Sequence, residues 1–308
     1  MEKENHTAVS NFILTSLASH QEQRIILFVV FLAMYLTALI GNGLIIAAIY
    51  LDSRLHTPMY FFLSLLSMLD ISFITTTVPN TMKNLLSERR SISYPGCLTQ
   101  LFFLIFLAGA ECFLLAAMAY DRLVAICSPL QYAMVMNQRL CYQLAIGSFV
   151  GGFLKSILHT LMILRLSFCG SNIINHFFCD MTALYKLSCT DTFLNEVMLF
   201  IEVPFCLMAP FLAIVFSYCR IILTILRMPS AEGRRKAFST CSSHLTVVTL
   251  LYGTIIVMYI RPSSAYSPEK DKVVAVVYIV VTPMVNPFIY SLRNNDMKGA
   301  LRRAIGKR

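Results

Sequence analysis

Charged residues are scarce in this sequence, and their scarcity excludes an ordinary soluble protein. They make up 13% of the 308 residues, while hydrophobic residues make up 57%; soluble domains have about 25% and about 45–50%. The first 23 residues lack the apolar core of a cleavable signal peptide, so we expect the first membrane helix to act as the targeting signal. No internal repeat is visible, which argues against a transporter built from repeats. The composition predicts an integral membrane protein.

Seven apolar segments are long enough to cross a membrane, which takes about 20 residues in a helix. They are residues 25–50, 58–82, 97–127, 140–164, 193–226, 237–260 and 273–292. We therefore predict an all-α membrane protein with a bundle of seven transmembrane helices (residues 25–292). An extracellular N-terminus (residues 1–24) precedes the bundle, and a cytoplasmic tail (residues 293–308) follows it.

The basic residues indicate the orientation. The net charge is +9, but the lysines and arginines lie in short loops between apolar segments, so we expect no nucleic-acid partner. With the N-terminus outside, the inner loops hold more of them than the outer loops, as membrane topology favours. In residues 295–308, apolar side chains recur at helical spacing and basic side chains occupy the other face. This pattern is typical of a short amphipathic helix bound to lipids of the anionic inner leaflet.

The predicted outer side carries two kinds of modification site. Asn5 begins the only glycosylation sequon, Asn-His-Thr. Cys97, Cys169, Cys179 and Cys189 fall on the same side, where disulfides persist. Four cysteines allow three pairings, and the sequence alone does not choose among them. Four unpaired thiols are the alternative.

The third apolar segment ends in MAYDRLVAIC, at residues 118–127, which places Asp121 and Arg122 at the membrane boundary. Its residues Leu104, Ala108, Glu111, Leu115, Met118 and Arg122 are three or four apart and share one helix face. Glu111 lies about 16 Å from Arg122 along the axis, at 1.5 Å per residue. Because a lipid-facing stripe would leave both charges in hydrocarbon, we expect this face to point into the bundle.

Further motifs follow in a fixed order along the chain. They are Gly41-Asn42, LHTPMY at 55–60, Ser217-Tyr218, KAFSTCSSHL at 236–245 and PMVNPFIYSLRN at 283–294. Together with residues 118–127, this set resembles the olfactory receptor family, within the rhodopsin-like G-protein-coupled receptors, over nearly the whole chain. The block at 236–245 is peculiar to olfactory receptors, whereas a lone Asn-Pro-x-x-Tyr would be weak evidence.

The resemblance implies an odorant receptor in the plasma membrane of olfactory neuron cilia, with an extracellular N-terminus. Such a receptor binds small lipophilic odorants in the outer half of the bundle and activates a stimulatory, olfactory-type G protein, which raises cyclic AMP. It is not an enzyme, and the sequence shows no nucleophile–base motif. The alternatives are a non-olfactory chemosensory receptor of the same fold and a small membrane transporter. The resemblance also pairs Cys97 with Cys179 and Cys169 with Cys189.

The resemblance assigns a signalling switch to the inner end of the bundle. Arg122 would exchange its resting partner Asp121 for the G protein, and Tyr218 and Tyr290 would engage Arg122 in the active receptor. Lys236 and His244 of the sixth-segment block belong to the same set. The sequence departs from the family pattern at Leu123, where a tyrosine is usual. The chain has no tryptophan, so Tyr252 occupies the level of the tryptophan found in other rhodopsin-like receptors.

A polar cluster is expected in mid-membrane. Asp70 lies at a depth similar to that of Glu111, and Asn42 and Asn286 join them. Two nearby carboxylates cannot both ionise cheaply, so either a cation binds between them or one holds a proton. In related receptors the equivalent cluster binds sodium and favours the inactive state. A protonated network without metal is an equal alternative, and no other cofactor is expected.

The outer half forms the ligand cavity by analogy with the family. The candidate lining residues are Leu104, Ile105, Ala108, Gly109, Glu202, Val203, Cys206, Tyr252, Ile255, Ile256 and Tyr259. An apolar pocket with few polar groups suits a small lipophilic ligand.

Lys155 and Glu202 carry opposite charges at matched depths, each about 13 Å below the outer end of its helix. Because consecutive helices are usually neighbours, this placement predicts an interhelical ion pair. In the competing interpretation, Glu202 is the counter-ion of an amine ligand and Lys155 reaches toward the membrane interface.

Overall fold

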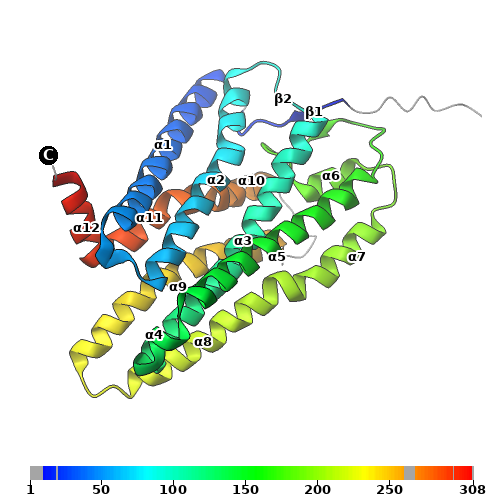
Figure 1. The fold of residues 1–308 in the computed structure, drawn as a ribbon. Helices are drawn as coiled ribbons and strands as arrows, with labels where there is room; N and C mark the ends of the chain where they lie inside the picture. Colours follow the sequence, from blue (N-terminus) through cyan, green and yellow to red (C-terminus); the bar gives the residue numbers. More distant parts are fainter. Residues whose placement is uncertain (1–9, 19, 260–267, 294, 307–308) are drawn as a thin grey trace, which may run out of the picture.

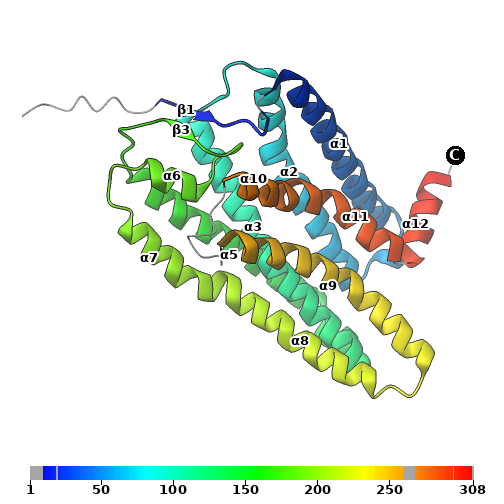
Figure 2. The same cartoon turned by 180° about the vertical axis from the view of Figure 1, so that it is seen from behind.

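The computed structural model describes residues 10–18, 20–259, 268–293 and 295–306. Within them, seven helical spans are long and apolar enough to cross a membrane. Figure 1 and Figure 2 show them packed side by side as a bundle. They are α1 (Gln21–Leu51), α2 (Pro58–Leu86), α3 (Tyr94–Cys127), α5 (Gln138–Leu164), the rod of α7 (Phe193–Glu202), η3 (Val203–Met208) and α8 (Ala209–Leu226), α9 (Ala231–Tyr259), and the rod of α10 (Pro268–Val276), η5 (Val277–Val281) and α11 (Thr282–Arg293). The predicted fold class is confirmed.

Local sequence signals fix several helix ends. The Ser93 hydroxyl accepts a hydrogen bond from Gly96 N (3.2 Å), and Asn137 Oδ1 accepts one from Leu140 N (2.9 Å). Each side chain satisfies a backbone N–H that has no partner within the first turn. Pro58 begins α2, where a missing N–H costs nothing.

Two π-helical segments interrupt the longer rods. In η3, Ala209 N–H donates to the carbonyl of Pro204, five residues earlier, and in η5 Thr282 N–H donates to Val277 in the same way. Pro204 has no N–H of its own, so the regular bonding pattern is broken at this level. Such wide turns often occur at functional sites, and η3 contains two candidate ligand residues, Val203 and Cys206.

Helix α3 is the centre of the bundle and contacts α2, α5, α8 and α9. Its approach to α5 depends on glycine. A Cβ on Gly152 would come within 2.5 Å of the Phe106 carbonyl oxygen and 2.6 Å of Ala110 N. Only glycine allows backbones to come so close.

Large apolar side chains cover the outside of the bundle. Ile26, Leu154 and Phe200 are exposed by 62%, 60% and 83%. In water such a surface would promote aggregation, whereas lipid tails solvate it. The exposed faces therefore agree with a membrane environment.

One end of the bundle, here the sheet end, carries a small sheet that the sequence did not predict. Its strands β1 (Asn11–Leu14), β2 (Ser91–Ser93) and β3 (Ile173–Ile174) are ordered β2-β1-β3, with β1 antiparallel to β2 and parallel to β3. Phe12 and Leu14 of β1 are buried and alternate with exposed neighbours. The N-terminal segment is thereby held against the loop between α5 and α7, which also contains α6 (Met181–Leu187).

Both disulfides lie at the sheet end, with the pairing that the resemblance implied. Cys97 of α3 is bonded to Cys179, and Cys169 to Cys189 within the same long loop. Cys97 and Cys179 are fully buried. The first bridge ties the loop to the central helix, and the second closes the loop on itself.

Cys97→Ser and Cys179→Ser should each cause a large loss of surface expression. The double variant should be little worse than either single variant. Once the bridge is lost, the second replacement has no further bond to break. Flow cytometry of tagged receptor measures this. Cys219→Ser is the matched control, because Cys219 is an exposed free cysteine. Additive losses in the double variant would contradict the shared bridge.

The opposite end, here the Arg122 end, holds η1 (Ser53–Leu55), η2 (Pro129–Gln131), α4 (Tyr132–Val135) and α12 (Asn295–Gly306). In Figure 1, α12 turns away from α11 and lies beside the end of α1. Arg303 Nη2 and Nε donate to Asp52 Oδ2 at 2.5 and 3.1 Å, and this contact lowers the pKa of Asp52. The expected short C-terminal helix is present.

Candidate functional site

A charged cluster joins α5 to α7 in the half of the bundle nearer the sheet end. Lys155 Nζ lies 2.7 Å from Glu202 Oε1, which is the predicted ion pair. His159 Nε2 contacts the other carboxylate oxygen of Glu202. His159 is 1% exposed and Glu202 9%, whereas Lys155 is 22% exposed. Glu202 is therefore already paired on both oxygens in this structure.

The sequence interpretation missed the part of His159. This residue follows Lys155 by four positions, so the two side chains lie on one face of α5. This spacing of four residues could have predicted that His159 lies beside Lys155. A carboxylate that pairs with Lys155 from the neighbouring helix can also reach His159.

The cluster lies beside the candidate ligand residues of α3. A Cβ on Gly109 would lie 3.3 Å from Lys155 Cδ and 3.0 Å from Gly152 Cα. Gly109 thus packs against α5 instead of lining open space, and its small size lets the Lys155 stem pass over α3. Leu104 is buried, and Ile105 and Ala108 are partly buried on the same helix.

The remaining candidates lie on η3 and α9. Ile255 and Tyr252 are buried, Cys206 is partly buried, and Val203 and Ile256 are exposed. The ring of Tyr252 packs against Phe211 at 4.8 Å between centroids, and its buried hydroxyl has no hydrogen-bond partner among the described residues. The Cys112 thiol is the polar group that interacts with this hydroxyl. The side chain of Tyr259, like that of Lys236, lies outside the described part of the chain, and so does Asn5.

The expected polar cluster does form in the middle of the bundle. Asn286 Nδ2 donates to both oxygens of Asp70, at 3.1 and 3.0 Å. Asn42 Nδ2 donates to the carbonyls of Ala38 and Pro283, at 3.1 and 3.0 Å. Glu111 lies close enough to interact electrostatically with Asp70. All four polar side chains are at least nine-tenths buried.

Several acceptor oxygens in this cluster have no donor. Asn42 Oδ1, Asn286 Oδ1 and Glu111 Oε1 are buried without hydrogen-bond partners among the described residues. Buried acceptors in native proteins are almost always satisfied. Carboxylate and amide oxygens are also the ligands that hard cations prefer. The described residues include no group of three or more His, Cys, Asp or Glu side chains that could hold a metal, but here two of the four candidates are amides.

At the Arg122 end, Asp121 has a different partner from the one expected. Its Oδ1 accepts a hydrogen bond from the Tyr132 hydroxyl of α4 (2.7 Å), and no ion pair joins Asp121 to Arg122, both of which the structure describes. Adjacent residues on a helix point to different faces. Burial and the Asp121 carboxylate raise the pKa of Tyr132, which keeps its phenol protonated as the donor. Arg122 still lies close enough to act on Asp121 electrostatically, so the role of Asp121 as the resting partner of Arg122 stays a prediction.

Arg122 is 8% exposed and lies among the switch residues. It is close enough to Tyr218, His244 and Tyr290 to act on each electrostatically. The Tyr290 hydroxyl is buried without a hydrogen-bond partner among the described residues. Arg122 is thus buried inside the bundle, and the Tyr290 hydroxyl has no competing hydrogen-bond partner among the described residues.

His244 connects three helices at this level. Its Nε2 lies 3.1 Å from the Leu115 carbonyl oxygen of α3, and its Nδ1 lies 2.8 Å from the Tyr218 hydroxyl of α8. A carbonyl only accepts, so Nε2 carries the proton and Nδ1 accepts from Tyr218. Neutral His244 therefore links α9 to both α3 and α8, and α9 cannot move outward without breaking these bonds.

The comparisons with known proteins agree with this arrangement. A family model described as olfactory receptor matches residues 31–308. The chain belongs to the olfactory receptor family. It is 51% identical to "Olfactory receptor 1" of Rattus norvegicus over 308 residues, which cover 100% of this chain and 98% of the relative. It is 52% identical to "Olfactory receptor 1E16" of Mus musculus over the same shares, and 52% identical to "Olfactory receptor 1F1" of Homo sapiens over 98% of this chain and 97% of that one.

Family membership sets the general function. Olfactory receptors are multi-pass plasma-membrane receptors for odorants that act through G proteins, and they are not enzymes. The transporter alternative is thereby excluded. The seven helices and the two disulfides agree with such a receptor.

Proposed function

We propose that this olfactory receptor binds its odorant between α3, α5, η3 and α9 and activates a stimulatory, olfactory-type G protein, which raises cyclic AMP. The observation that carries the proposal is the buried position of Arg122 beside Tyr218, Tyr290 and the His244 link. One end of the bundle thus holds a closed switch, and the other half holds candidate ligand residues around a polar cluster. We also propose that the sheet end is extracellular, because disulfides persist there. Asn5 would carry an N-linked glycan, and the receptor would reside in olfactory neuron cilia.

Activation would be a population shift between two arrangements of the bundle. An odorant that contacts Tyr252 and Ile255 acts on α9, the helix that also carries His244. A ligand that binds better when α9 is displaced favours the state in which the His244 bonds are broken. Arg122 then becomes free to meet Tyr290 and the G protein. The ligand shifts the equilibrium only by its difference in affinity for the two states.

A ligand panel tests the receptor and its coupling together. Cells that express the chain should raise cyclic AMP in response to at least one neutral lipophilic odorant, and cells that lack stimulatory G-protein α subunits should not. Returning the olfactory α subunit should restore the response. Calcium signals without cyclic AMP would overturn the proposed coupling class, while responses restricted to non-odorant metabolites would favour a non-olfactory chemosensory receptor.

We further propose that the cluster of Asp70, Glu111, Asn42 and Asn286 holds a sodium ion that favours the inactive bundle. The unpaired acceptor oxygens of Asn42, Asn286 and Glu111 support this proposal, because a cation would satisfy them together. The ion would offset the repulsion between the two acids, and Asp70 would both ligate it and keep its bond to Asn286.

Sodium should raise the unfolding temperature of purified receptor by a few degrees when it replaces choline at constant chloride. A ligand that binds only the folded state stabilises it in proportion to the logarithm of its concentration above Kd. Asp70→Asn should remove this effect, and Asp52→Asn, which changes an acid outside the membrane spans, should keep it. Equal unfolding temperatures of the unmodified receptor in sodium and choline would favour the protonated network without metal.

A further inference from the structure

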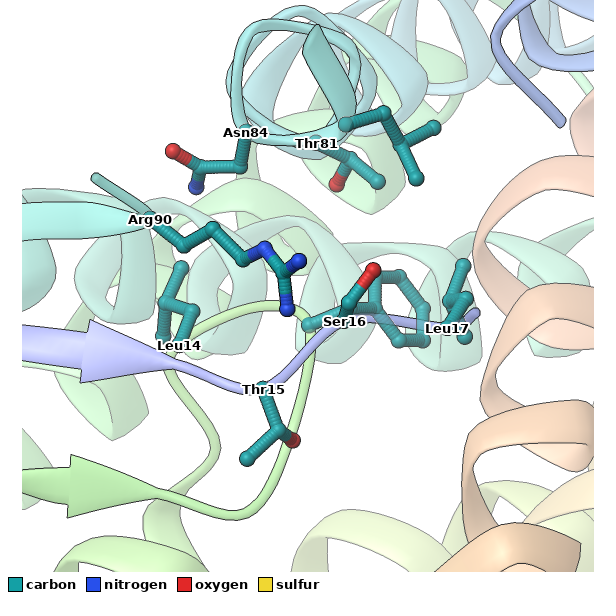
Figure 3. Close-up of a pocket in the computed structure, with 9 residues that line it drawn as sticks. Leu14, Thr15, Ser16, Leu17, Thr81, Asn84 and Arg90 are labelled. Atoms are coloured by element: carbon teal, nitrogen blue, oxygen red, sulfur yellow. The ribbon is translucent and has the colours of Figure 1, made fainter. Parts of the chain in front are cut away.

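A cleft at the sheet end belongs to neither the candidate ligand site nor the switch. It lies between the end of β1 with the residues that follow it and the last turns of α2, as Figure 3 shows. Phe177 of the long loop also lines it. The space it leaves for a water-sized sphere is about 10 Å³, far below the roughly 300–1,000 Å³ of pockets for drug-sized ligands. Its occupant must therefore be small.

Polar groups without partners border this cleft. Asn84 is 7% exposed, and neither its Nδ2 nor its Oδ1 has a hydrogen-bond partner among the described residues. The buried Nε of Arg90 is without an acceptor as well. In Figure 3 the Arg90 guanidinium extends across the cleft toward Ser16. Because buried polar groups are normally paired, two unpaired donors on one cleft indicate a missing acceptor.

Ser16 supplies a third donor on the opposite wall. Its hydroxyl oxygen accepts a hydrogen bond from Ala18 N at 3.3 Å, which leaves the hydroxyl proton available. Thr81 also borders the cleft, but its hydroxyl already donates to the Thr77 carbonyl at 3.0 Å. The donors that remain are the amide of Asn84, the guanidinium of Arg90 and the hydroxyl of Ser16.

The charge at the cleft is positive. Arg24 lies near Arg90 and is fixed there, because its Nε and Nη2 donate to the carbonyls of Leu85 and Ser87 at 2.8 and 2.7 Å. No ion pair joins Arg90 to an acid among the described residues, and burial and the nearby Arg24 both lower the pKa of Arg90. Among the described residues that line the cleft, none is acidic, and Glu88 borders only the wider mouth beside it.

We propose that this cleft binds a small monovalent anion, either a halide or a carboxylate the size of formate, through Asn84 Nδ2, the Arg90 guanidinium and the Ser16 hydroxyl. Hydrogen bonds between ionised partners are about twice as strong as neutral ones, so one such ion would satisfy the amide and the guanidinium together. Neutral water would satisfy the donors but leave the charge uncompensated.

The anion would also fasten the sheet to the bundle. Leu14 N–H donates to the Arg90 carbonyl at 2.8 Å, and Thr15 N–H lies 3.1 Å from the carbonyls of Ile174 and His176. Ser16 thus follows directly on the junction of all three strands, while Asn84 belongs to α2. An ion held by both would connect the N-terminal segment, the long loop and a transmembrane helix.

Thermal unfolding of purified full-length receptor tests the proposal at fixed sodium concentration and fixed ionic strength. Replacing gluconate with chloride, bromide or formate should raise the unfolding temperature along a saturating curve, because gluconate is too bulky for the cleft. The anion with the lowest half-saturating concentration, chloride or formate, identifies the preferred class. Unfolding temperatures that are the same in gluconate and in every small anion would overturn the proposal.

Single-residue variants show whether the stabilisation by small anions comes from this cleft. Arg90→Gln and Asn84→Leu should each raise the half-saturating concentration about tenfold or more, the loss expected for one charge-assisted hydrogen bond, and Ser16→Ala should have a smaller effect in the same direction. Arg89→Gln is the matched control, since it removes the same charge from the exposed neighbouring residue, and it should leave the curve unchanged. Equal weakening by Arg89→Gln and Arg90→Gln would show general surface screening instead of a site.

Ser16→Ala and Glu88→Gln provide two further tests of the anion site. If Arg90→Gln does not fold, Ser16→Ala changes only one partly buried hydroxyl and still reports on the cleft. Glu88→Gln should keep or strengthen the anion response, because it removes a competing carboxylate at the mouth; loss of the response would mean that Glu88 itself builds the site and would overturn the assignment. The readout needs no odorant or G protein, so its failure would leave the proposed function untouched.

Discussion

Replacing Arg122 with alanine is expected to abolish ligand-driven G-protein activation while leaving most of the receptor at the cell surface. Arg122 is buried at the Arg122 end, without an ion pair to Asp121 in this structure, so its loss removes no salt bridge from the resting state. Its proposed function is to meet Tyr290 and the G protein after α9 moves. The result is measured as cyclic AMP at matched surface density, with odorant binding measured separately.

The matched control for this variant is Arg139→Ala, which removes an exposed arginine from the first turn of α5 at the same end. It should signal normally. Asp121→Asn should raise basal signalling instead, because it weakens the hydrogen bond that holds α4 against α3. Full ligand-driven signalling by Arg122→Ala at matched surface density would exclude Arg122 from the switch.

The bundle itself could be predicted from the sequence because its physical signal is long and redundant. A span of about 20 apolar residues has few other uses, so all seven helices were found. The sheet had no comparable signal. Its strands have two to four residues. Their pairing joins Ile13 to Ser91 and to Ile173, residues far apart in the sequence that local patterns do not connect.

Side-chain partners were predicted correctly where depth in the membrane alone identified them. They were missed where the direction of the side chain around the helix axis was needed as well. Matched depth along the membrane normal was sufficient to pair Lys155 with Glu202. It gave no direction around the helix axis, so His159 was not included. The lack of direction around the helix axis also explains why the bond of Asp121 to Tyr132 was missed. The neighbour of Asp121 in sequence points to another face, while Tyr132 of α4 comes close to Asp121.

Gly109 shows a further limit of the sequence. It was placed in the ligand cavity, with Leu104 and Ala108, by analogy with the family. Whether a residue on a central helix faces a cavity or a neighbouring helix depends on the rotation of the whole bundle. Here the glycine pair of Gly109 and Gly152 sets that rotation, because the two backbones meet where neither residue has a side chain.

Glu202 is the central member of the cluster of Lys155, His159 and Glu202. Glu202→Gln should lower surface expression more than Lys155→Met does, because Glu202 is the member shared by both contacts. After Lys155→Met, the carboxylate still has His159; after Glu202→Gln, the buried face of α5 keeps two basic groups and no acid. Breaking a buried pair typically costs about 3–5 kcal/mol, and the partial exposure of Lys155 should reduce that cost here.

The double replacement of Lys155 by methionine and Glu202 by glutamine should recover much of the expression lost by Glu202→Gln alone, since it removes the unpaired ammonium as well. Glu196→Gln, an exposed position on the same helix, is the matched control and should express normally. If Glu202 serves mainly as the counter-ion of an amine odorant, Glu202→Gln will instead express normally and lose amine responses selectively, with no rescue by Lys155→Met. Surface expression together with an amine and neutral-odorant panel separates the two outcomes, because a structural ion pair supports every response of the receptor and a ligand counter-ion supports only one chemical class.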